Sequence, residues 1–322
     1  MTTFKSSLRI LYGFYYDFNR FFRYGGWKKS TNLKYREYLA VRIYHKLEKC
    51  MSFSDRRVDA GQNAAHELIK FYESKPKNQE LGFHESIGLT VLTNYRDQSD
   101  IPLALSHKIQ LLLDAFTYDS HEPTDYKGYI ESAKKSNFSF STSFESAESF
   151  FNTRHSLRSF TNQKVDINDL SRAINLARTT PSVCNRQSWK CYYIINDRQL
   201  IDYALEFQSG NRGFGHRIPC LLIITSDLLA FHDSSERYQN WIDGGMFSMN
   251  LLLAIHSVNL GACPLNWSRG PGRDSAFRNK FKIPINENII MMIGVGHYPE
   301  KYRVCESARK PLSETMIELK KK

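Results

Sequence analysis

The segment RHSLRSF, residues 154–160, combines residue types that bind anions. Arg154, His155 and Arg158 are potential cations, and Ser156 adds a hydroxyl group. Arginine and serine side chains make charge-assisted hydrogen bonds to phosphate groups. A basic stretch of this length is also common on solvated surfaces. Taken alone, the segment therefore predicts either an anion site or a charged turn.

A second segment, TTPSVCNRQSWKCYYI at residues 179–194, places Ser182, Asn185 and Gln187 just before an aromatic, β-branched stretch. Pro-Ser-x-x-Asn alone is typical of a turn that stops a helix. The following Gln-x-Trp and the strand-like YYII favour a functional turn that leads into a strand. Hydroxyl and amide groups can satisfy polar ring edges without taking part in redox chemistry.

Two more segments lie further along the chain. DGGMFSMNLLLAIHSVNLGACPLNW, residues 243–267, predicts a buried helix followed by a turn. GVGHYPEKYRVCESARKPLSE, residues 294–314, carries Arg309 beside Lys310. In their order and spacing, the four segments resemble the FMN-dependent nitroreductase family, and the resemblance covers about residues 150–319.

The resemblance implies a binding site for the FMN phosphate and ribityl chain in the first and last segments. The implied contacts of the first segment are Arg154, His155, Ser156 and Arg158. Arg309 would close over the phosphate from the far end of the domain. Because a flavin phosphate carries close to two negative charges, a second group of cations is chemically reasonable.

The two middle segments would then surround the isoalloxazine ring. The resemblance places Ser182, Asn185 and Gln187 along the ring. It also implies a loop that presents a backbone N–H to flavin N5, and the matching positions are Pro264, Leu265, Asn266 and Trp267.

The sequence departs from the family pattern at two places. Ser188 replaces the commoner proline, and Asn266-Trp267 stands where several relatives have Glu-Gly. The second change removes a carboxylate from the rim of the site and adds an indole. Arg186, inside the second segment, is a candidate contact for an anionic substrate.

The activity implied by the resemblance is that of an FMN-dependent oxidoreductase. NADH or NADPH would deliver hydride and leave, and an electron-poor small-molecule acceptor would then enter the same space in a ping-pong cycle. The cofactor performs the redox chemistry, so no catalytic side chain is required. Family members build each flavin site from two subunits, which implies a homodimer with two FMN sites.

The elements that must position these residues differ between the two halves of the chain. From residue 141 to 322 we expect an α+β fold, a nitroreductase-like flavin domain with a mixed central sheet flanked by helices. INDLSRAINLARTT predicts a helix begun by an Asp or Asn cap. KCYYIIND, IPCLLIITSD and NIIMMIGVGHYP predict strands, and GGMFSMNLLLAIHSVNLG predicts a helix closed by Gly261.

Residues 1–140 predict a mainly helical extension, with helices near residues 33–50, 59–74 and 101–118. YHKLEK, residues 44–49, resembles the extension of nitroreductase-like proteins linked to polysaccharide biosynthesis. KKSNFSFSTSFESAESFFNTRH, residues 134–155, is rich in serine and predicts a connector. We expect the domain boundary near residue 140.

The first predicted helix, residues 4–24, has an apolar stripe at spacings of three and four. The stripe consists of Phe4, Leu8, Leu11, Tyr15, Phe18 and Phe22. Four cations lie off the stripe, at Lys5, Arg9, Arg20 and Arg23. Such a helix can lie on a membrane surface, or its apolar face can pack on this protein or on a second subunit. The alternative function is therefore a flavin-fold protein that acts mainly as a membrane-surface or partner-binding module.

Composition narrows the remaining classes. With 322 residues, 41% of them hydrophobic, the chain is long enough for two folded domains. Its apolar stretches are too short to span a membrane and its start lacks a signal peptide, so we expect a cytoplasmic protein. Of the net charge of +11, residues 1–60 hold 13 Lys or Arg against 5 Asp or Glu. Charge alone supports nucleic-acid binding, which we do not expect. The cysteines predict neither disulfides nor a metal site.

Overall fold

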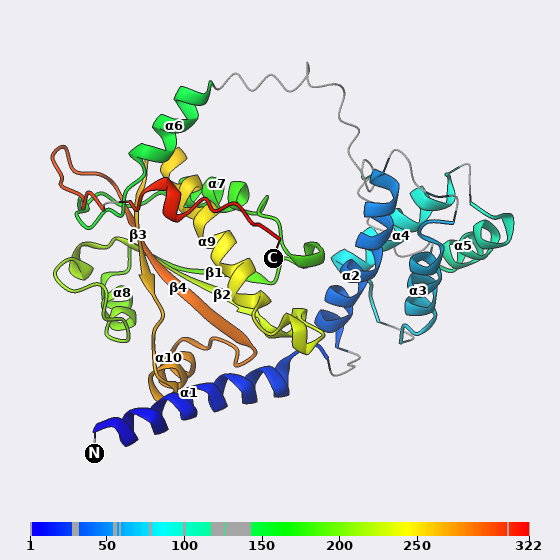
Figure 1. The fold of residues 1–322 in the computed structure, drawn as a ribbon, viewed down its shortest axis with the longest axis horizontal. Helices are drawn as coiled ribbons and strands as arrows, with labels where there is room; N and C mark the ends of the chain where they lie inside the picture. The colour runs from blue at the N-terminus through cyan, green and yellow to red at the C-terminus, as the bar shows by residue number, and fades with distance from the viewer. Residues whose placement is uncertain are drawn as a thin grey trace.

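The structure is a computed structural model of the chain. It describes residues 2–27, 32–53, 57, 59–76, 79–98, 101–116, 126, 143–307 and 309–321, with side chains from residue 7 onward. The described residues form a sheet domain and a separate group of helices (Figure 1). The expected boundary at residue 140 lies outside the described residues.

Four strands form the central sheet in the order β1-β2-β4-β3. They are β1 Trp189–Ile195, β2 Cys220–Asp227, β3 Gly261–Asn266 and β4 Glu287–Gly296. Neighbouring strands pair antiparallel, and a single parallel bridge joins Ser156 to Ala262. The expected mixed sheet is therefore antiparallel in its four named strands. β2 is buried along its whole length, as its apolar sequence predicts.

Successive residues of β2 face two different layers of helices. Leu222 and Ile224 belong to the core beneath α7 and α9, whereas Leu221 and Ile223 belong to the core on the opposite side. This alternation is the ordinary period of a strand, and both layers are apolar because both faces are covered. The sheet therefore has no solvated face along its central strand.

Regular helices flank the sheet. They are α6 Phe144–Thr153, α7 Ile167–Ala177, α8 Arg198–Leu205, α9 Gln239–Ser257 and α10 Pro271–Phe281. Short 3-10 turns are η1 Val183–Asn185, η2 Gly215–Arg217, η3 Leu228–Ala230, η4 Ser234–Glu236 and η5 Leu312–Glu314. The predicted cap of α7 is confirmed, because the Asp166 side chain accepts a hydrogen bond from the Asn168 backbone at 2.8 Å.

A second apolar core lies in the helical region. Its helices are α2 Leu33–Ser52, α3 Gln62–Glu73, α4 Phe83–Arg96 and α5 Leu103–Phe116. Three of them lie where the sequence predicts helices. α4 is an addition, and its first turn is fixed by the Glu85 carboxylate, which accepts a hydrogen bond from the Gly82 backbone at 3.1 Å.

Two predictions for the sheet domain are wrong. The serine-rich connector is helical over its last part, since α6 begins at the Ser143 cap; none of its residues is buried, so no stripe of core residues marks this helix in the sequence. Gly261 does not close α9. Asn259 adopts the left-handed conformation after the helix, and Gly261 opens β3, where a Cβ would overlap the Leu157 side chain.

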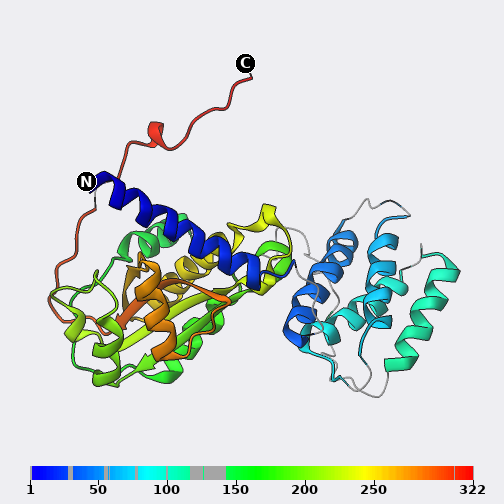
Figure 2. The same cartoon turned by 90° about the horizontal axis from the view of Figure 1, so that it is seen from below.

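α1, Thr2–Tyr24, lies along the sheet domain beside α10 and away from the other N-terminal helices (Figure 2). It ends before Gly25-Gly26, as predicted. Among the helices that the structure describes, none is both long and apolar enough to cross a membrane. The N-terminal region therefore contributes one helix to the surface of the sheet domain and four to a core of its own.

α2 joins the helical region to the sheet domain. The Lys34 ammonium pairs with Asp227 at the end of β2, and the Tyr38 hydroxyl donates to the same carboxylate at 3.3 Å. Glu287 of β4 lies alongside, 3.9 Å from the Lys34 ammonium, and also contacts Lys190. Asp227 and Glu287 are both fully buried, so the contact between α2 and the sheet domain contains charged groups that are shielded from solvent.

Candidate functional site

A cavity of about 290 Å³ collects the residues predicted to bind a phosphate. Its lining includes Arg154, His155, Ser156 and Arg158 from the first segment and Arg309 from the last. Phe151, Asn152, Cys305, Glu306 and Ser307 complete it. The two ends of the sheet domain thus meet at one cavity, as the order of the segments predicted.

Pairing with β3 fixes the first wall of this cavity. α6 ends at Thr153, so the chain is extended from Arg154 onward. Ser156 then pairs with Ala262, and the Leu157 N–H donates to the Ala262 carbonyl at 2.9 Å. Because the Leu157 side chain is fully buried, residues on either side of it are held at the surface. Backbone pairing and one apolar anchor therefore aim the flanking polar side chains.

The second wall comes from the C-terminal segment. The Arg158 guanidinium lies 3.5 Å from the Cys305 sulfur, which ties residues 154–158 to the segment after β4. Arg309 donates to the Ser307 carbonyl on the same wall. Three guanidinium groups line the cavity against one carboxylate, that of Glu306. Such a donor set suits a phosphate, because each arginine can make charge-assisted hydrogen bonds.

His256 lies behind this cavity. Its imidazole contacts the Thr153 hydroxyl at 3.0 Å and the Tyr298 hydroxyl at 3.5 Å. Burial lowers the pKa of His256, and the charges of Arg154 and His155 lower it further. His256 could not be selected from the sequence, because it is one residue in the pattern of a helix. Its neutral form avoids adding a further charge to the cationic wall.

The second predicted segment forms a strained turn. Cys184, Asn185 and Gln187 all have positive φ, at 49°, 51° and 48°. Such conformations cost about 1–3 kcal/mol each for residues other than glycine and occur often at binding sites. The Ser182 hydroxyl accepts a hydrogen bond from the Gln187 backbone at 2.9 Å, which closes the turn. Ser182 thus supports the backbone as well as offering its hydroxyl edge.

Arg186 holds this turn from behind. Its side chain is fully buried and forms a bidentate ion pair with Glu236. It also donates to the Val183 carbonyl at 3.2 Å and to the Ala230 carbonyl. The predicted substrate contact does not fit this arrangement, because the guanidinium is committed to internal acceptors. The sequence could not show this, since Glu236 lies 50 residues away.

Asp243 of α9 supports the same turn from another side. Both of its carboxylate oxygens lie within 3.4 Å of the Val183 backbone nitrogen, and Gln239 donates to one of them at 2.8 Å. Burial raises the pKa of Asp243 despite these hydrogen bonds and the nearby Arg186 charge. α9 therefore positions the turn as well as covering the sheet.

The third predicted group lies at the end of β3. Pro264, Leu265 and Asn266 are strand residues rather than a loop. The Leu265 side chain is buried in the core, so only its backbone can face a ligand. The Asn266 side chain is exposed and donates to Ser268 at 2.9 Å, and the Gln208 amide donates to the Asn266 carbonyl. The polar group available at this rim is thus the Asn266 amide.

Trp267 is fixed by a carboxylate. Its indole N–H donates to Asp274 of α10 at 2.7 Å. Asp274 also accepts from the Tyr16 hydroxyl at 2.8 Å and from Arg278 at 2.6 Å. Burial alone would raise the pKa of Asp274, but the hydrogen bond and charge of Arg278 outweigh it, together with Trp267 and Tyr16, and the pKa is lowered. α1 therefore contacts the residue that orients Trp267.

The turn at residues 182–187 does not line the arginine cavity. It packs instead against α2, at the side of the domain that faces the helical region. Within one protomer, the structure therefore brings together the predicted phosphate contacts but leaves the predicted ring contacts elsewhere.

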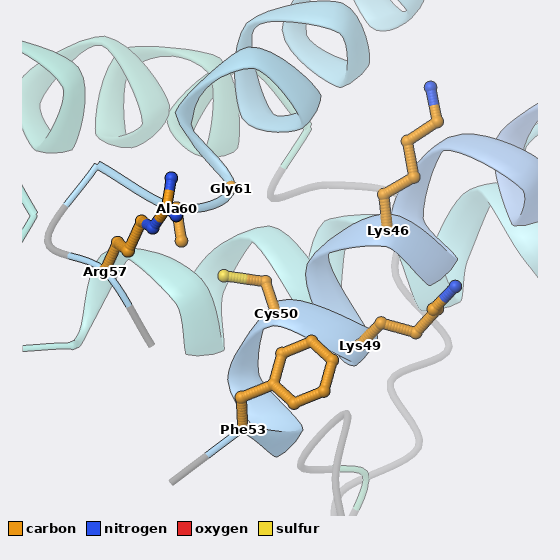
Figure 3. Close-up of a pocket in the computed structure, with 7 residues that line it drawn as sticks. All are labelled: Lys46, Lys49, Cys50, Phe53, Arg57, Ala60 and Gly61. Atoms are coloured by element: carbon orange, nitrogen blue, oxygen red, sulfur yellow. The ribbon is translucent and has the colours of Figure 1, made fainter. Parts of the chain in front are cut away.

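A larger cavity, of about 420 Å³, lies in the helical region. Figure 3 shows Cys50 directed toward the turn at Ala60 and Gly61, whereas Lys46 and Lys49 extend away from it. Lys46 also pairs with Glu67 at 2.6 Å. The polar groups of this cavity do not converge, and none of the predicted flavin contacts lines it. Across the described residues, no group of His, Cys, Asp and Glu is arranged to hold a metal ion.

The chain is similar to known proteins over its C-terminal half. A model described as the nitroreductase family matches residues 152–211 and 202–297. A protein of Archaeoglobus fulgidus, described as a candidate NADH dehydrogenase/NAD(P)H nitroreductase, is 24% identical over 152 residues, 46% of this chain and 82% of that protein. The iodotyrosine deiodinase of Drosophila melanogaster is 25% identical over 196 residues, 51% of this chain and 66% of the deiodinase.

Among solved structures, a candidate nitroreductase from Desulfovibrio desulfuricans in complex with FMN is similar at 19% identity and a TM-score of 0.46. The match covers 54% of this chain and 97% of that chain. The matched residues of this chain begin at α6 and include β1 to β4. Residues 152–297, within the C-terminal half of the chain, therefore match the nitroreductase family.

Proposed function

We propose that this protein is an FMN-dependent oxidoreductase that carries hydride from NADH or NADPH to an electron-poor small molecule. The main support for this proposal is the cavity that Arg154, Arg158 and Arg309 line together. These arginines come from opposite ends of a domain that matches the nitroreductase family. Bound FMN would supply the hydride-transfer chemistry. The names of the relatives, which include an NAD(P)H nitroreductase, support the donor.

The side chains of the protein would then bind and orient FMN. Arg154, His155, Ser156, Arg158 and Arg309 would hold the phosphate, since charge-assisted hydrogen bonds suit that group. The donor would leave before the acceptor enters the same space, so one slot serves both in a ping-pong cycle. The site needs no side chain to move a proton, which agrees with the absence of a catalytic carboxylate from the predicted contacts.

The rim of the slot would differ from that of several relatives. Asn266 offers a neutral amide where a carboxylate is common, and Trp267 adds an indole whose plane Asp274 fixes. A neutral rim repels anionic acceptors less than a carboxylate does. We therefore infer an acceptor that is electron-poor and neutral or anionic, and that is flat enough to lie beside an indole.

We propose that the working unit is a homodimer. The strained turn at residues 182–187 lies outside the arginine cavity of its own protomer, so a second copy would bring its turn to the flavin. α9 presents exposed apolar side chains suited to such a contact. They are Trp241, Ile242, Met246 and Met249, each between 42% and 50% exposed.

A chemical protection experiment tests the cofactor site without measuring activity. Cys305 is exposed and lines the arginine cavity, whereas Cys191 and Cys220 have pKa values raised to about 12 by burial. Alkylation of the apoprotein should therefore modify Cys305 in preference to these two. Added FMN should slow modification of Cys305, which lines the arginine cavity.

Two results would overturn the proposal. One is a protein that neither retains nor binds FMN. The other is bound FMN that leaves Cys305 as reactive as before. A yellow protein whose colour bleaches without oxygen on addition of NADH or NADPH would support the donor. The cytoplasmic location stays a prediction from the sequence. The alternative membrane-surface role concerns the outer face of α1 and does not compete with this chemistry.

A further inference from the structure

The outward face of α1 is a continuous row of large apolar side chains. Six of them are between 47% and 72% exposed: Leu8, Leu11, Phe14, Tyr15, Phe18 and Phe22. Single exposed apolar residues are ordinary on protein surfaces. A row that follows one helix face is not ordinary, because a helix of a globular protein normally buries its apolar stripe. Figure 2 shows α1 lying across the outside of the sheet domain.

The inner face of α1 is held by polar contacts, which fixes the helix with its apolar row outward. The buried Arg20 guanidinium donates to the Ile285 carbonyl at 2.8 Å and to the Glu287 carbonyl at 2.7 Å. One turn earlier, the Tyr16 hydroxyl donates to Asp274. At the end of the helix, the Gly26 N–H donates to the Phe231 carbonyl at 2.7 Å. Rotation that would bury the row must break all three contacts.

We propose that this face docks on the surface of an anionic lipid bilayer, with α1 lying parallel to the membrane. Residues 1–29 carry six Lys or Arg and one Asp, and Arg9 and Arg23 are exposed on α1 itself. At 100° per residue, Arg23 lies next to the edge of the row formed by Leu8 and Tyr15, and a cation at that edge reaches lipid phosphates while the row enters the acyl boundary. Trp27, 42% exposed just after α1, is also suited to the headgroup region.

Charge favours lipid over a second copy of the chain as the occupant. A symmetric contact between two α1 rows would bring Arg23 of both copies close to one interface, where like charges repel. Lipid phosphates reverse the sign of that interaction. At 1.5 Å per residue, the 23-residue helix is about 35 Å long, so many headgroups lie within its reach. The proposal concerns location and stands apart from the flavin chemistry.

Co-sedimentation of the full-length protein with vesicles tests the proposal. Two vesicle types are compared: phosphatidylcholine alone, and phosphatidylcholine mixed with phosphatidylglycerol. The test variant is the double substitution Phe14→Glu/Phe18→Glu, which places charge in the middle of the row. The control is Leu103→Glu, because Leu103 is 88% exposed on α5 and lies outside the row.

The parent and the Leu103→Glu control should bind the mixed vesicles and bind phosphatidylcholine much less. The double variant should lose about a hundredfold or more in partition coefficient, since each phenylalanine contributes strongly when buried. Arg9→Glu/Arg23→Glu should reduce binding to the mixed vesicles and lose most of the dependence on salt. FMN retention, measured on the same samples, should stay at the parent level and shows that each variant is folded.

Three outcomes would overturn the proposal. The parent could fail to bind mixed vesicles, or the double variant could bind them as well as the parent does. The third outcome concerns mass: if Phe14→Glu/Phe18→Glu lowers the molar mass in solution without vesicles, the row is an interface between copies. If the parent protein does not bind FMN, the flavin proposal is wrong. The vesicle result tests the membrane proposal independently of that outcome.

Discussion

Three arginines meet at one cavity, and their charges make it unstable when it is empty of anions. Arg154 and Arg158 come from the start of the sheet domain and Arg309 from its end. Guanidinium groups that share a small cavity repel one another, and Glu306 compensates only part of that charge. An anion that binds the folded state alone would raise the free energy of unfolding. FMN, and inorganic phosphate at higher concentration, should therefore raise the melting temperature.

Replacement of the cavity arginines tests the phosphate assignment. Arg158→Ala and Arg309→Ala should each weaken FMN binding by about tenfold or more, because each removes charge-assisted hydrogen bonds. Titration of FMN fluorescence measures the dissociation constant. Arg172→Ala, on an exposed surface of α7, is the control and should leave it unchanged. Parent affinity in both cavity variants would refute the assignment.

Arg186 should matter for folding rather than for substrate. Arg186→Met removes one member of a buried ion pair and leaves Glu236 without its partner, which should lower the free energy of unfolding by about 3 kcal/mol or more. Urea unfolding measures the change. The exposed pair of Arg172 and Asp169 provides the contrast, because Arg172→Ala should cost at most about 1 kcal/mol. A neutral effect of Arg186→Met would show that the pair does not support the turn.

Residues that belong to motifs could be predicted from the sequence, whereas residues that hold those motifs in place through distant contacts could not. Arg158 and Arg309 could be predicted because their segments recur in a known order. The burial of Arg186 could not be predicted, because its partner Glu236 lies in a 3-10 turn that no sequence pattern indicates. Asp227 and Glu287 were missed for the same reason, since their compensating Lys34 lies in another region.

One carboxylate links α1, β3 and α10. Asp274 accepts from Tyr16 of α1 and from Trp267 after β3, while Arg278 pairs with it on α10. Burial also raises the pKa of Tyr16 to about 12, and its hydrogen bond to Asp274 contributes to that increase. The tyrosine hydroxyl therefore stays a donor at ordinary pH. Any movement of α1 would therefore shift Asp274 and change the position of the Trp267 indole at the predicted rim of the site.

The lowered pKa of Asp274 predicts an acid dependence of stability. Its ordinary value is 3.8 and its value in the fold is lower, so the ionised carboxylate favours the folded state. This contribution is fully present above about pH 4 and disappears as the pH falls through the lower value. The free energy of unfolding of Asp274→Asn should therefore fall less steeply than that of the parent below pH 4.

Urea unfolding over a series of pH values measures these slopes. Asp202→Asn, on the exposed side of α8, controls for the loss of a carboxylate as such. Equal slopes in Asp274→Asn and the parent would show that the carboxylate is not held by Arg278, Trp267 and Tyr16 in solution.

Elements with an apolar stripe or a buried run could be predicted, and those without one could not. β2 and α9 have long apolar sequences, which is why both were expected. α6 has no buried residue, so nothing in its sequence opposed the expectation of a connector. α1 is the reverse case. Its stripe correctly predicted a helix, but its contacts with the protein are made by Tyr16 and Arg20 on the other side.

The molecule as a whole is expected to be active as a pair. If one copy supplies the arginine cavity and the other the turn at residues 182–187, two different defects can complement each other. Arg158→Ala and Asn185→Ala protomers should each bind FMN poorly as homodimers. After the two are mixed and allowed to exchange subunits, about a quarter of the sites should recover, since half the dimers are mixed and each holds one intact site.

FMN content after gel filtration measures the recovery. Mixing Arg158→Ala with Arg309→Ala is the control, because both residues line the same cavity and every mixed dimer keeps one defect in each site. No recovery in the first mixture, with exchange shown by differently tagged subunits, would mean that each protomer builds its own site.

The buried carboxylates where α2 meets the sheet domain also bear on how separable the two regions are. Lys34 and Tyr38 neutralise and hydrogen-bond Asp227 from outside the family domain, beside Glu287. Excision of the N-terminal helices would remove the Lys34 charge from two buried carboxylates and leave them with Lys190 as their cation, which is destabilising. Genetic exchange that transferred only residues 141–322 to another protein would carry this defect with it. We therefore expect residues 141–322 alone to be less stable than the full chain.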